Sequence, residues 1–144
     1  MPNKPIAVAC DHAGCNLKRD LVEELSLLGY EVLDLGTDGP ESVDYPDFAY
    51  ALARTIEEEQ CDFGVLVCGT GIGISMAANR HRRVRAAPCH DATSTRLARQ
   101  HNDANVLALG ARLVGTEVAK DCLRMFLETP FEGGRHERRV DKLG

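Results

Sequence analysis

The chain has 144 residues, of which 44% are apolar and 27% are charged, and its formal net charge is −5. A chain of this size can bury a full core without disulfide or metal support, so we expect residues 1–144 to form one domain. The negative charge disfavours nucleic-acid binding, which depends on Lys and Arg, and the lack of a charged leader or a long apolar run predicts a cytoplasmic protein without membrane contact.

Five short apolar runs rich in β-branched residues alternate with helix-length segments. The runs predict strands over residues 6–10, 30–35, 63–68, 84–87 and 106–109. Because strands that alternate with helices form parallel sheets covered on both faces, we expect an α/β fold with three αβα layers. The sheet is predicted to be Rossmann-like, doubly wound, parallel and five-stranded.

The first two helices are indicated by helical periodicity and by their end signals. Leu17, Leu21 and Leu25 mark the apolar face of the first helix, and Gly29 ends it. Pro46 suits the first turn of a second helix, expected over about residues 47–59.

Three further helices are expected, one starting within residues 71–74, one over about 91–100 and one over about 116–127. We expect Leu97 of the second of these to face inward, and the last to pack through Val118, Cys122 and Phe126. An arginine-rich C-terminal tail follows Pro130.

Two unusual loops follow the first and third predicted strands, where doubly wound folds bind ligands. They are Asp11-His12-Ala13-Gly14 and Cys68-Gly69-Thr70-Gly71-Ile72-Gly73-Ile74-Ser75. The alternating glycines of the second loop leave backbone N–H groups open to an anion just as a helix begins. The loop matches neither a Walker A sequence nor the dinucleotide G-x-G-x-x-G pattern, which disfavours ATP and NAD. Alternatively, its glycines only form a tight turn.

Six cysteines are scattered without a C-x-x-C pair, which indicates reduced thiols. A single buried cysteine is commonly just a small apolar residue, and this interpretation stays open for Cys68. The helix start beside Cys68 would however favour its thiolate, and no Asp or Glu within residues 69–75 competes as a base. Thr70 could hydrogen-bond the sulfur or a substrate oxygen.

Two histidines and two arginines add to this picture. His12 and His101 each border a polar loop, either as capping residues or as parts of a site. Arg135 and Arg139 are four residues apart, a spacing that suits phosphate binding but also occurs on solvated helices. The basic run over residues 80–85 is interpreted as solvated.

Five motifs, in this order and over nearly the whole chain, resemble those of the type B ribose-5-phosphate isomerases, a family that includes allose-6-phosphate and galactose-6-phosphate isomerases. They are Cys10-Asp11-His12-Ala13-Gly14, Asp44-Tyr45-Pro46, the Cys68–Ser75 loop, Arg99-Gln100-His101-Asn102 and Glu132-Gly133-Gly134-Arg135-His136.

The resemblance implies an aldose–ketose isomerase of pentose phosphate metabolism. It would interconvert ribose 5-phosphate and ribulose 5-phosphate through a cis-enediolate, without a metal or a cofactor. Cys68 would be the base, assisted by Thr70, and His101 the acid that opens the sugar ring. The residues implied to bind substrate are Asp11, His12, Tyr45, Gly69, Gly71, Ile72, Gly73, Ile74, Asn102, Arg112, Arg135 and Arg139.

Within this set the resemblance implies separate roles. His12, Arg112, Arg135 and Arg139 would bind the phosphate, whereas the loop amides would hold the enediolate oxygens. Asp11 and Asn102 would contact sugar hydroxyls, and Tyr45 would line the sugar pocket. The resemblance also implies a homodimer or tetramer whose active sites are shared between subunits. Allose 6-phosphate or galactose 6-phosphate isomerisation and a non-catalytic phosphate-binding module are the alternatives.

Overall fold

Five parallel strands form one sheet in the computed structural model, which describes residues 4–144, so residues 1–3 of the predicted domain lie outside the described residues. The strands are β1 (Ile6–Cys10), β2 (Val32–Asp34), β3 (Gly64–Cys68), β4 (Ala86–Pro88) and β5 (Val106–Gly110). Their order across the sheet is β2-β1-β3-β5-β4. Every residue of β1, β3 and β5 is buried, as expected of strands covered on both faces.

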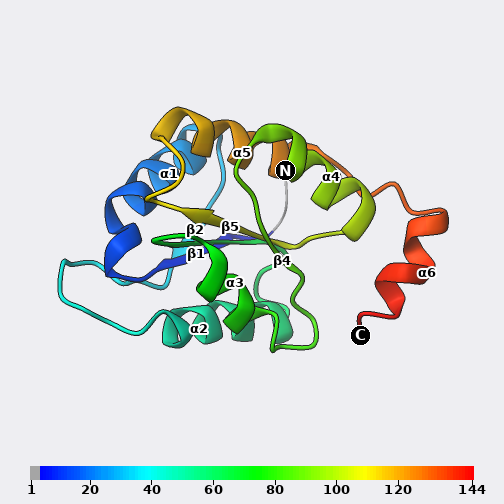
Figure 1. Ribbon diagram of the computed structural model, residues 1–144, viewed down its shortest axis with the longest axis horizontal. Helices are drawn as coiled ribbons and strands as arrows, with labels where there is room; N and C mark the ends of the chain where they lie inside the picture. The colour runs from blue at the N-terminus through cyan, green and yellow to red at the C-terminus, as the bar shows by residue number, and fades with distance from the viewer. Residues whose placement is uncertain (1–3) are drawn as a thin grey trace.

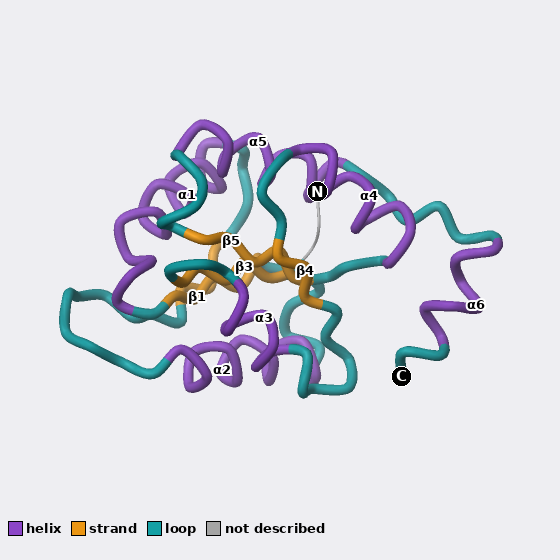
Figure 2. Tube along the Cα trace, viewed as in Figure 1, coloured by secondary structure: helices purple, strands orange, loops and turns teal. Residues whose placement is uncertain are grey.

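Helices cover both faces of this sheet (Figure 1). One face carries α1 (Cys15–Leu27), α4 (Ala92–Asn102) and α5 (Thr116–Glu128), and the other carries α2 (Tyr45–Glu57) and α3 (Ile72–Ala78) (Figure 2). A 3-10 turn, η1 (His12–Gly14), precedes α1. The predicted three-layer α/β fold is therefore confirmed. Among residues 4–144 there is no helix with the length and apolar character that crossing a membrane requires.

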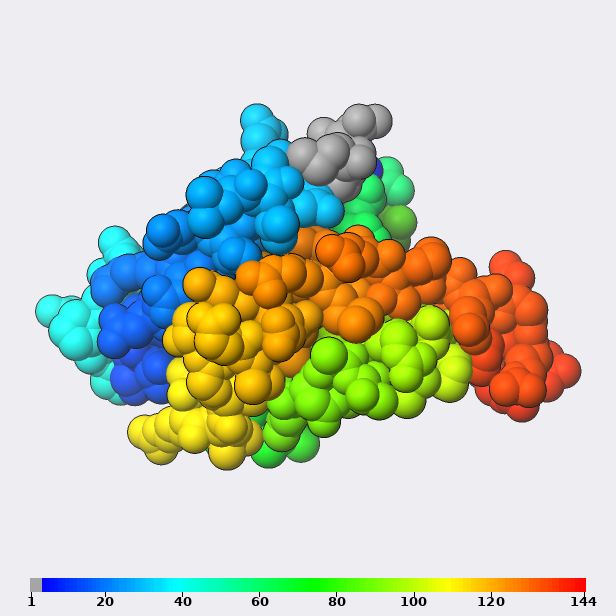
Figure 3. Space-filling view, turned by 90° about the horizontal axis from the view of Figure 1, so that it is seen from above, coloured from blue at the N-terminus to red at the C-terminus, as the bar shows by residue number. Residues whose placement is uncertain are grey.

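The arginine-rich tail contains a short helix, α6 (Arg135–Asp141), none of whose residues is buried. It projects from the end of the molecule beside α4, away from the three layers (Figure 3). Since no side chain of α6 enters the core, its position depends on its contacts with α4 and on the segment that leads to it.

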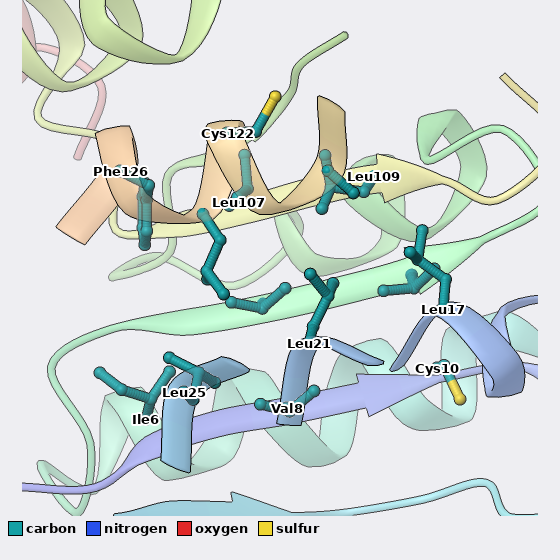
Figure 4. Packing of buried hydrophobic residues seen from close by; sticks show 14 of the residues in the cluster. Ile6, Val8, Cys10, Leu17, Leu21, Leu25, Leu107, Leu109, Cys122 and Phe126 are labelled. Atoms are coloured by element: carbon teal, nitrogen blue, oxygen red, sulfur yellow. The ribbon is translucent and has the colours of Figure 1, made fainter. Parts of the chain in front are cut away.

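One of the two clusters of buried core residues lies between the sheet and the layer of α1 and α5 (Figure 4). Leu21 and Leu25 of α1 and Leu123 and Phe126 of α5 are at most 2% exposed. Each such side chain stabilises the fold by roughly 1.5–3 kcal/mol relative to an exposed one. The period of 3.6 residues places these four side chains on the sheet-facing side of their helices.

Three strands start later than predicted, β3 by one residue and β2 and β4 by two. In β2 and β4 other groups take the backbone donors at the predicted start. The N–H of Tyr30 donates to the carbonyl of Leu25 at 3.0 Å and so completes the end of α1, and β2 begins only at Val32. The N–H of Arg85 donates to the side chain of Asn105 at 2.7 Å, and β4 begins one residue later. Apolar composition predicts strand character but does not reveal such competing partners.

Two predicted core contacts were wrong. Leu97 is only half-buried, whereas Thr95 and Arg99 are the buried residues of α4. On α5, Val118 is 40% exposed, and the next residue, Ala119, is fully buried instead. On α4 the two buried residues lie two positions to either side of Leu97, whereas on α5 the predicted packing through Cys122 and Phe126 is confirmed.

Arg99 is buried with hydrogen-bond partners for its Nε and Nη1 atoms. It donates to the carbonyls of Thr129 and Ala104 at 3.0 and 2.6 Å and to the carboxylate of Asp103 at 2.9 Å. Its guanidinium also lies 5.1 Å from the ring centre of Phe63. A buried charge is tolerated only when it is paired in this way, and the pairing joins the end of α4 to the end of α5.

The packing predicts the stability of two leucine variants. Leu123→Ala, in the core, should lower the free energy of unfolding by about 2–5 kcal/mol, because it removes buried methyl groups and leaves a cavity. Leu27→Ala is the matched control, since Leu27 is 77% exposed, and should change it by less than about 0.5 kcal/mol. Urea denaturation at one protein concentration measures both values, and equal losses would contradict the described core.

Candidate active site

The loops after β1, β3 and β5 are joined at the carboxyl edge of the sheet. β2 lies on one side of β1 and β3 on the other, so the winding direction reverses between β1 and β3. The N–H of Asp11 donates to the carbonyl of Val67 at 3.2 Å, and the N–H of Ala111 donates to the carbonyl of Cys68 at 2.8 Å. This is the position at which open α/β sheets bind ligands.

Cys68 is the last residue of β3, and its side chain lies under the following turn. Its Sγ accepts a hydrogen bond from the N–H of Gly71 at 3.1 Å, and the residue is 5% exposed. Gly71 has φ +76°, and a Cβ at this position would lie 3.0 Å from the carbonyl carbon of Leu109. Glycine is therefore needed for the turn that brings its N–H to the sulfur.

The same turn opens α3 with backbone donors that have no partner within the helix. The N–H of Ile72 donates to Oγ1 of Thr70 at 3.2 Å. Gly73 and Ile74 belong to the first turn of α3, where N–H groups have no carbonyl partner within the helix. Two amides are therefore available to an oxyanion next to Cys68, and the oxygen of Thr70 helps to fix the loop that carries them.

Two of the predicted substrate-binding side chains flank this loop. A Cβ on Gly73 would lie 2.8 Å from the ring of Tyr45, so the tyrosine packs directly against the loop backbone. A Cβ on Gly69 would lie 3.6 Å from Nε of Arg112, which brings an exposed guanidinium to the other side. An aromatic ring and a positive charge thus border the Cys68 turn.

Gly110, at the end of β5, is a positioning residue that the sequence reasoning missed. A Cβ there would lie 2.6 Å from the carbonyl carbon of Thr70, so any side chain would push the two loops apart. The available signal was a glycine placed directly after an apolar strand, where a close backbone approach is common.

Asp11 and His12 occupy the loop after β1. Oδ1 of Asp11 accepts the N–H of Ala13 at 3.0 Å and caps η1. Nδ1 of His12 accepts the N–H of Val43 at 3.1 Å, so in the neutral ring Nε2 carries the proton and is a donor. His12 and Arg19 line a hollow of about 270 Å³. The hollow is suited to a negatively charged group.

All six cysteines are free thiols, but four are poorly suited to act as a base. Burial raises the pKa of Cys10 to about 12, with a further contribution from Cys15, whose sulfur lies 3.7 Å away. Burial also raises the pKa values of Cys61, Cys89 and Cys122. A thiol with a raised pKa is protonated near neutral pH and is a weak base and nucleophile.

The remaining predicted site residues lie at the opposite edge of the sheet. Along β3 the residues Gly64 and Cys68 pair with Val106 and Gly110, so Val106 marks the amino edge. The α4 helix ends at Asn102, shortly before this edge, and carries His101. Four residues of strand, about 13 Å, separate the two edges, so one chain does not bring His101 or Asn102 to Cys68.

Arg135 and Arg139 belong to this second group because α6 packs against α4. The N–H of Glu132 donates to the carbonyl of Gln100 at 3.1 Å and holds the preceding segment against α4. Nη1 of Arg139 donates to the carbonyl of Arg135 at 3.3 Å, so the two arginines lie on one face of α6. The predicted site is thus divided between two parts of the chain.

His136 stacks on His101 within this second group. Their ring centres are 4.4 Å apart, with planes inclined by 14°. The pKa of His136 is lowered, mainly by desolvation and then by the positive charges of His101 and Arg135. His136 is therefore largely neutral at pH 7.

Comparison with known proteins gives consistent matches over the length of the chain. A family model described as Ribose/Galactose Isomerase matches residues 6–143. Ribose-5-phosphate isomerase B of Escherichia coli (strain K12) is 46% identical over 140 residues, which cover 97% of this chain and 94% of that protein.

Solved structures agree with these sequence matches. The ribose 5-phosphate isomerase of Thermotoga maritima is 50% identical with a TM-score of 0.96, covering 99% of this chain and 98% of that one. The ribose-5-phosphate isomerase B of Mycoplasma genitalium with bound ribulose 5-phosphate is 41% identical with a TM-score of 0.95, covering 99% and 95%. The chain therefore belongs to the ribose/galactose isomerase family of enzymes.

Proposed function

We propose that this chain interconverts ribose 5-phosphate and ribulose 5-phosphate, a reaction of pentose phosphate metabolism. Membership of the isomerase family supports the reaction class, and the Mycoplasma genitalium relative with bound ribulose 5-phosphate supports the substrate. The observation that carries the proposal is the sulfur of Cys68, which lies 3.1 Å from the N–H of Gly71 at the start of α3.

Cys68 is the proposed base for the proton transfer between C2 and C1. The thiolate takes the proton from C2 of the open-chain aldose, the electron pair forms the C1–C2 double bond, and the C1 carbonyl oxygen accepts the charge. The hydroxyl proton then moves from O2 to O1 of the enediolate. Return of the carbon-bound proton to C1 leaves the carbonyl at C2 and gives the ketose. The amides of Gly73 and Ile74 would hold the enediolate oxygens, and donors of this kind are each worth about 2.7–4 kcal/mol. Thr70 would assist the thiol.

His101 is the proposed acid for ring opening. It would donate a proton to the ring oxygen as the bond from C1 to that oxygen breaks, while the anomeric hydroxyl gives its proton to solvent water. Because His101 and Cys68 lie at opposite edges of one sheet, we propose that His101 acts on the Cys68 loop of a second copy of the chain. A homodimer, or a tetramer built from two dimers, would then contain shared sites.

The other predicted residues divide between the two copies in the same way. Arg135 and Arg139 would approach with His101 and bind the phosphate together with two residues beside the Cys68 loop, His12 and Arg112. Asn102 would arrive with the second copy and contact the sugar hydroxyls opposite Asp11, and Tyr45 would line the sugar pocket against Gly73. Gly69, Gly71 and Ile72 would contribute loop backbone.

The surface beside the Cys68 loop supports a subunit contact there. Tyr45, Tyr50, Ile72 and Met76 of α2 and α3 are 40%, 37%, 45% and 66% exposed. Contiguous exposed apolar side chains of this kind commonly mark protein interfaces. A second copy seated on them would cover the entrance to the loop.

Removal of the proposed base predicts a large loss of turnover. Cys68→Ala should lower kcat for ribose 5-phosphate by at least about 10²-fold, because no other group would carry the proton. Cys61→Ala is the matched control, since Cys61 is a buried cysteine that precedes the amino end of β3 and should keep near wild-type kcat. A coupled assay for ribulose 5-phosphate measures both variants.

Incorporation of solvent deuterium is a second test of the role of Cys68. In D₂O the wild-type enzyme should place deuterium on C1 of the ketose, because the thiol exchanges its proton with solvent. Turnover of Cys68→Ala within a few-fold of wild type would exclude Cys68 as the base. A covalent Cys68 adduct in place of deuterium incorporation would indicate thiol catalysis of another kind.

Subunit mixing tests the proposed shared site. Cys68→Ala and His101→Asn should each be inactive alone, yet a mixed dimer contains one site with both wild-type residues. Random reassociation of equal amounts should restore about one quarter of wild-type activity, since half of the dimers are mixed and each has one intact site of two. Reassociation of each variant with itself is the control, and a mixture that stays inactive would contradict shared sites.

The proposed substrate predicts a preference among sugar phosphates. Ribose 5-phosphate should give the highest kcat/KM when it is assayed beside allose 6-phosphate and galactose 6-phosphate. A higher value for either six-carbon sugar would assign that sugar as substrate, and turnover of none of the three would favour a non-catalytic phosphate-binding module.

A further inference from the structure

Three side chains with metal-ligand chemistry meet where α4 and α6 come together. They are His101 at the end of α4, Glu132 in the connecting segment and His136 in the first turn of α6, and their ligand atoms all lie within 4.8 Å of one another. Nε2 of His136 is 3.5 Å and Nε2 of His101 is 3.9 Å from the same oxygen, Oε1 of Glu132. Both imidazoles therefore direct the same type of nitrogen at one carboxylate oxygen.

The backbone holds these three side chains in place. The N–H of Glu132 donates to the carbonyl of Gln100, the residue before His101, at 3.1 Å. Gly133 and Gly134 have φ of +68° and +56°. The N–H of His136 donates to the carbonyl of Gly133 at 3.1 Å, and this turn brings His136 back next to Glu132. The ligands therefore need little ordering before they bind a cation.

We propose that His101, Glu132 and His136 form a binding site for a divalent transition-metal cation such as Zn²⁺ or Co²⁺. Two imidazoles and one carboxylate are a common ligand set for zinc, with a water in the fourth position. Zinc–nitrogen bonds of about 2.0–2.1 Å in a tetrahedron place neighbouring ligand atoms about 3.3 Å apart. The three ligand atoms lie within 4.8 Å of one another, so the imidazoles and the half-exposed Glu132 have to close their separations by at most about 1.5 Å to reach that spacing.

The chemistry of the cluster selects among cations. Imidazole nitrogen favours zinc, cobalt, nickel and copper, whereas magnesium and calcium prefer oxygen ligands in larger number. Glu132 supplies the only negative charge among the three ligands, and Arg135 and Arg139 on α6 oppose a cation. The site is thus suited to a reversibly bound metal and not to a permanently held one.

Metal binding would compete with proton donation by His101, a consequence that rests on the proposed function of this residue. Nε2 cannot coordinate a metal and carry a proton at the same time. A bound cation would also hold His101 against its own α6, so that it could not donate to a sugar bound at the Cys68 loop of another copy. Zinc is then an inhibitor of ring opening, and a chelator should restore activity.

Titration of the metal-free protein with Co²⁺ tests the site directly. We expect one Co²⁺ per chain with weak visible absorption and no thiolate-to-cobalt charge-transfer band, because the ligands are nitrogen and oxygen. Glu132→Gln and His136→Asn should each weaken binding at least tenfold. The matched control is His81→Asn, which removes another histidine–carboxylate pair, with Glu57 at 2.8 Å, and should bind like wild type.

Equal Co²⁺ affinity in wild type, Glu132→Gln and His136→Asn would overturn the site, as would a charge-transfer band that identifies a cysteine as the ligand. Circular dichroism checks that each variant is folded. If His136→Asn fails to fold, the half-exposed Glu132→Gln variant still decides the question, since its side chain lies outside the core.

Inhibition by Zn²⁺ tests the consequence separately, with each variant compared with its own zinc-free rate. Wild type and His81→Asn should be inhibited alike and recover on addition of a chelator, whereas Glu132→Gln should need at least tenfold more zinc for half-inhibition. Metal binding without inhibition of ribose 5-phosphate isomerisation would keep the site and refute the acid role of His101. Loss of the site would leave the proposed isomerase reaction untouched.

Discussion

The position of β3 between β1 and β5 is the constraint on which the Cys68 site depends. Parallel pairing on both sides fixes the register, so that Cys68 lies opposite Gly110 and the loops after all three strands leave the same edge of the sheet. Those loops can lie in contact only because Gly71 and Gly110 have no side chains. The sulfur, the first amides of α3 and Arg112 are neighbours because of sheet register and missing Cβ atoms.

Much of this arrangement could be predicted from the sequence, because the relevant signals are local. Apolar runs separated by helical periodicity indicated the layers, and alternating glycines after the third run indicated the turn that opens α3. The starts of β2 and β4 were harder to predict, since the N–H of Tyr30 completes the end of α1 and the N–H of Arg85 donates to a side chain 20 residues away. Arg99 was missed as a buried residue because its burial depends on three partners collected by folding.

The spacing of the motifs along the chain does not show that the predicted site residues form two groups, one around Cys68 and one around His101. A motif gives the spacing of residues along the chain, whereas the edge of the sheet at which a helix ends depends on strand order and direction. Once α4 is seen to run back from the end of β4 to the start of β5, His101 has to lie at the amino edge. The cluster of Glu132 with the two histidines likewise depends on how α6 folds back on α4.

Buried Arg99 links this exposed cluster to the interior. Its hydrogen bond to the carbonyl of Thr129 fixes the start of the segment that carries Glu132, and its own helix carries His101 two residues later. The spacing of the two imidazoles therefore depends on how Arg99 packs beside Phe63 and not on the solvent-exposed face of α4. Substitutions on that face would leave the spacing of the two imidazoles unchanged. A substitution of a buried residue that contacts the Arg99 guanidinium would instead shift both rings, although it contacts neither of them.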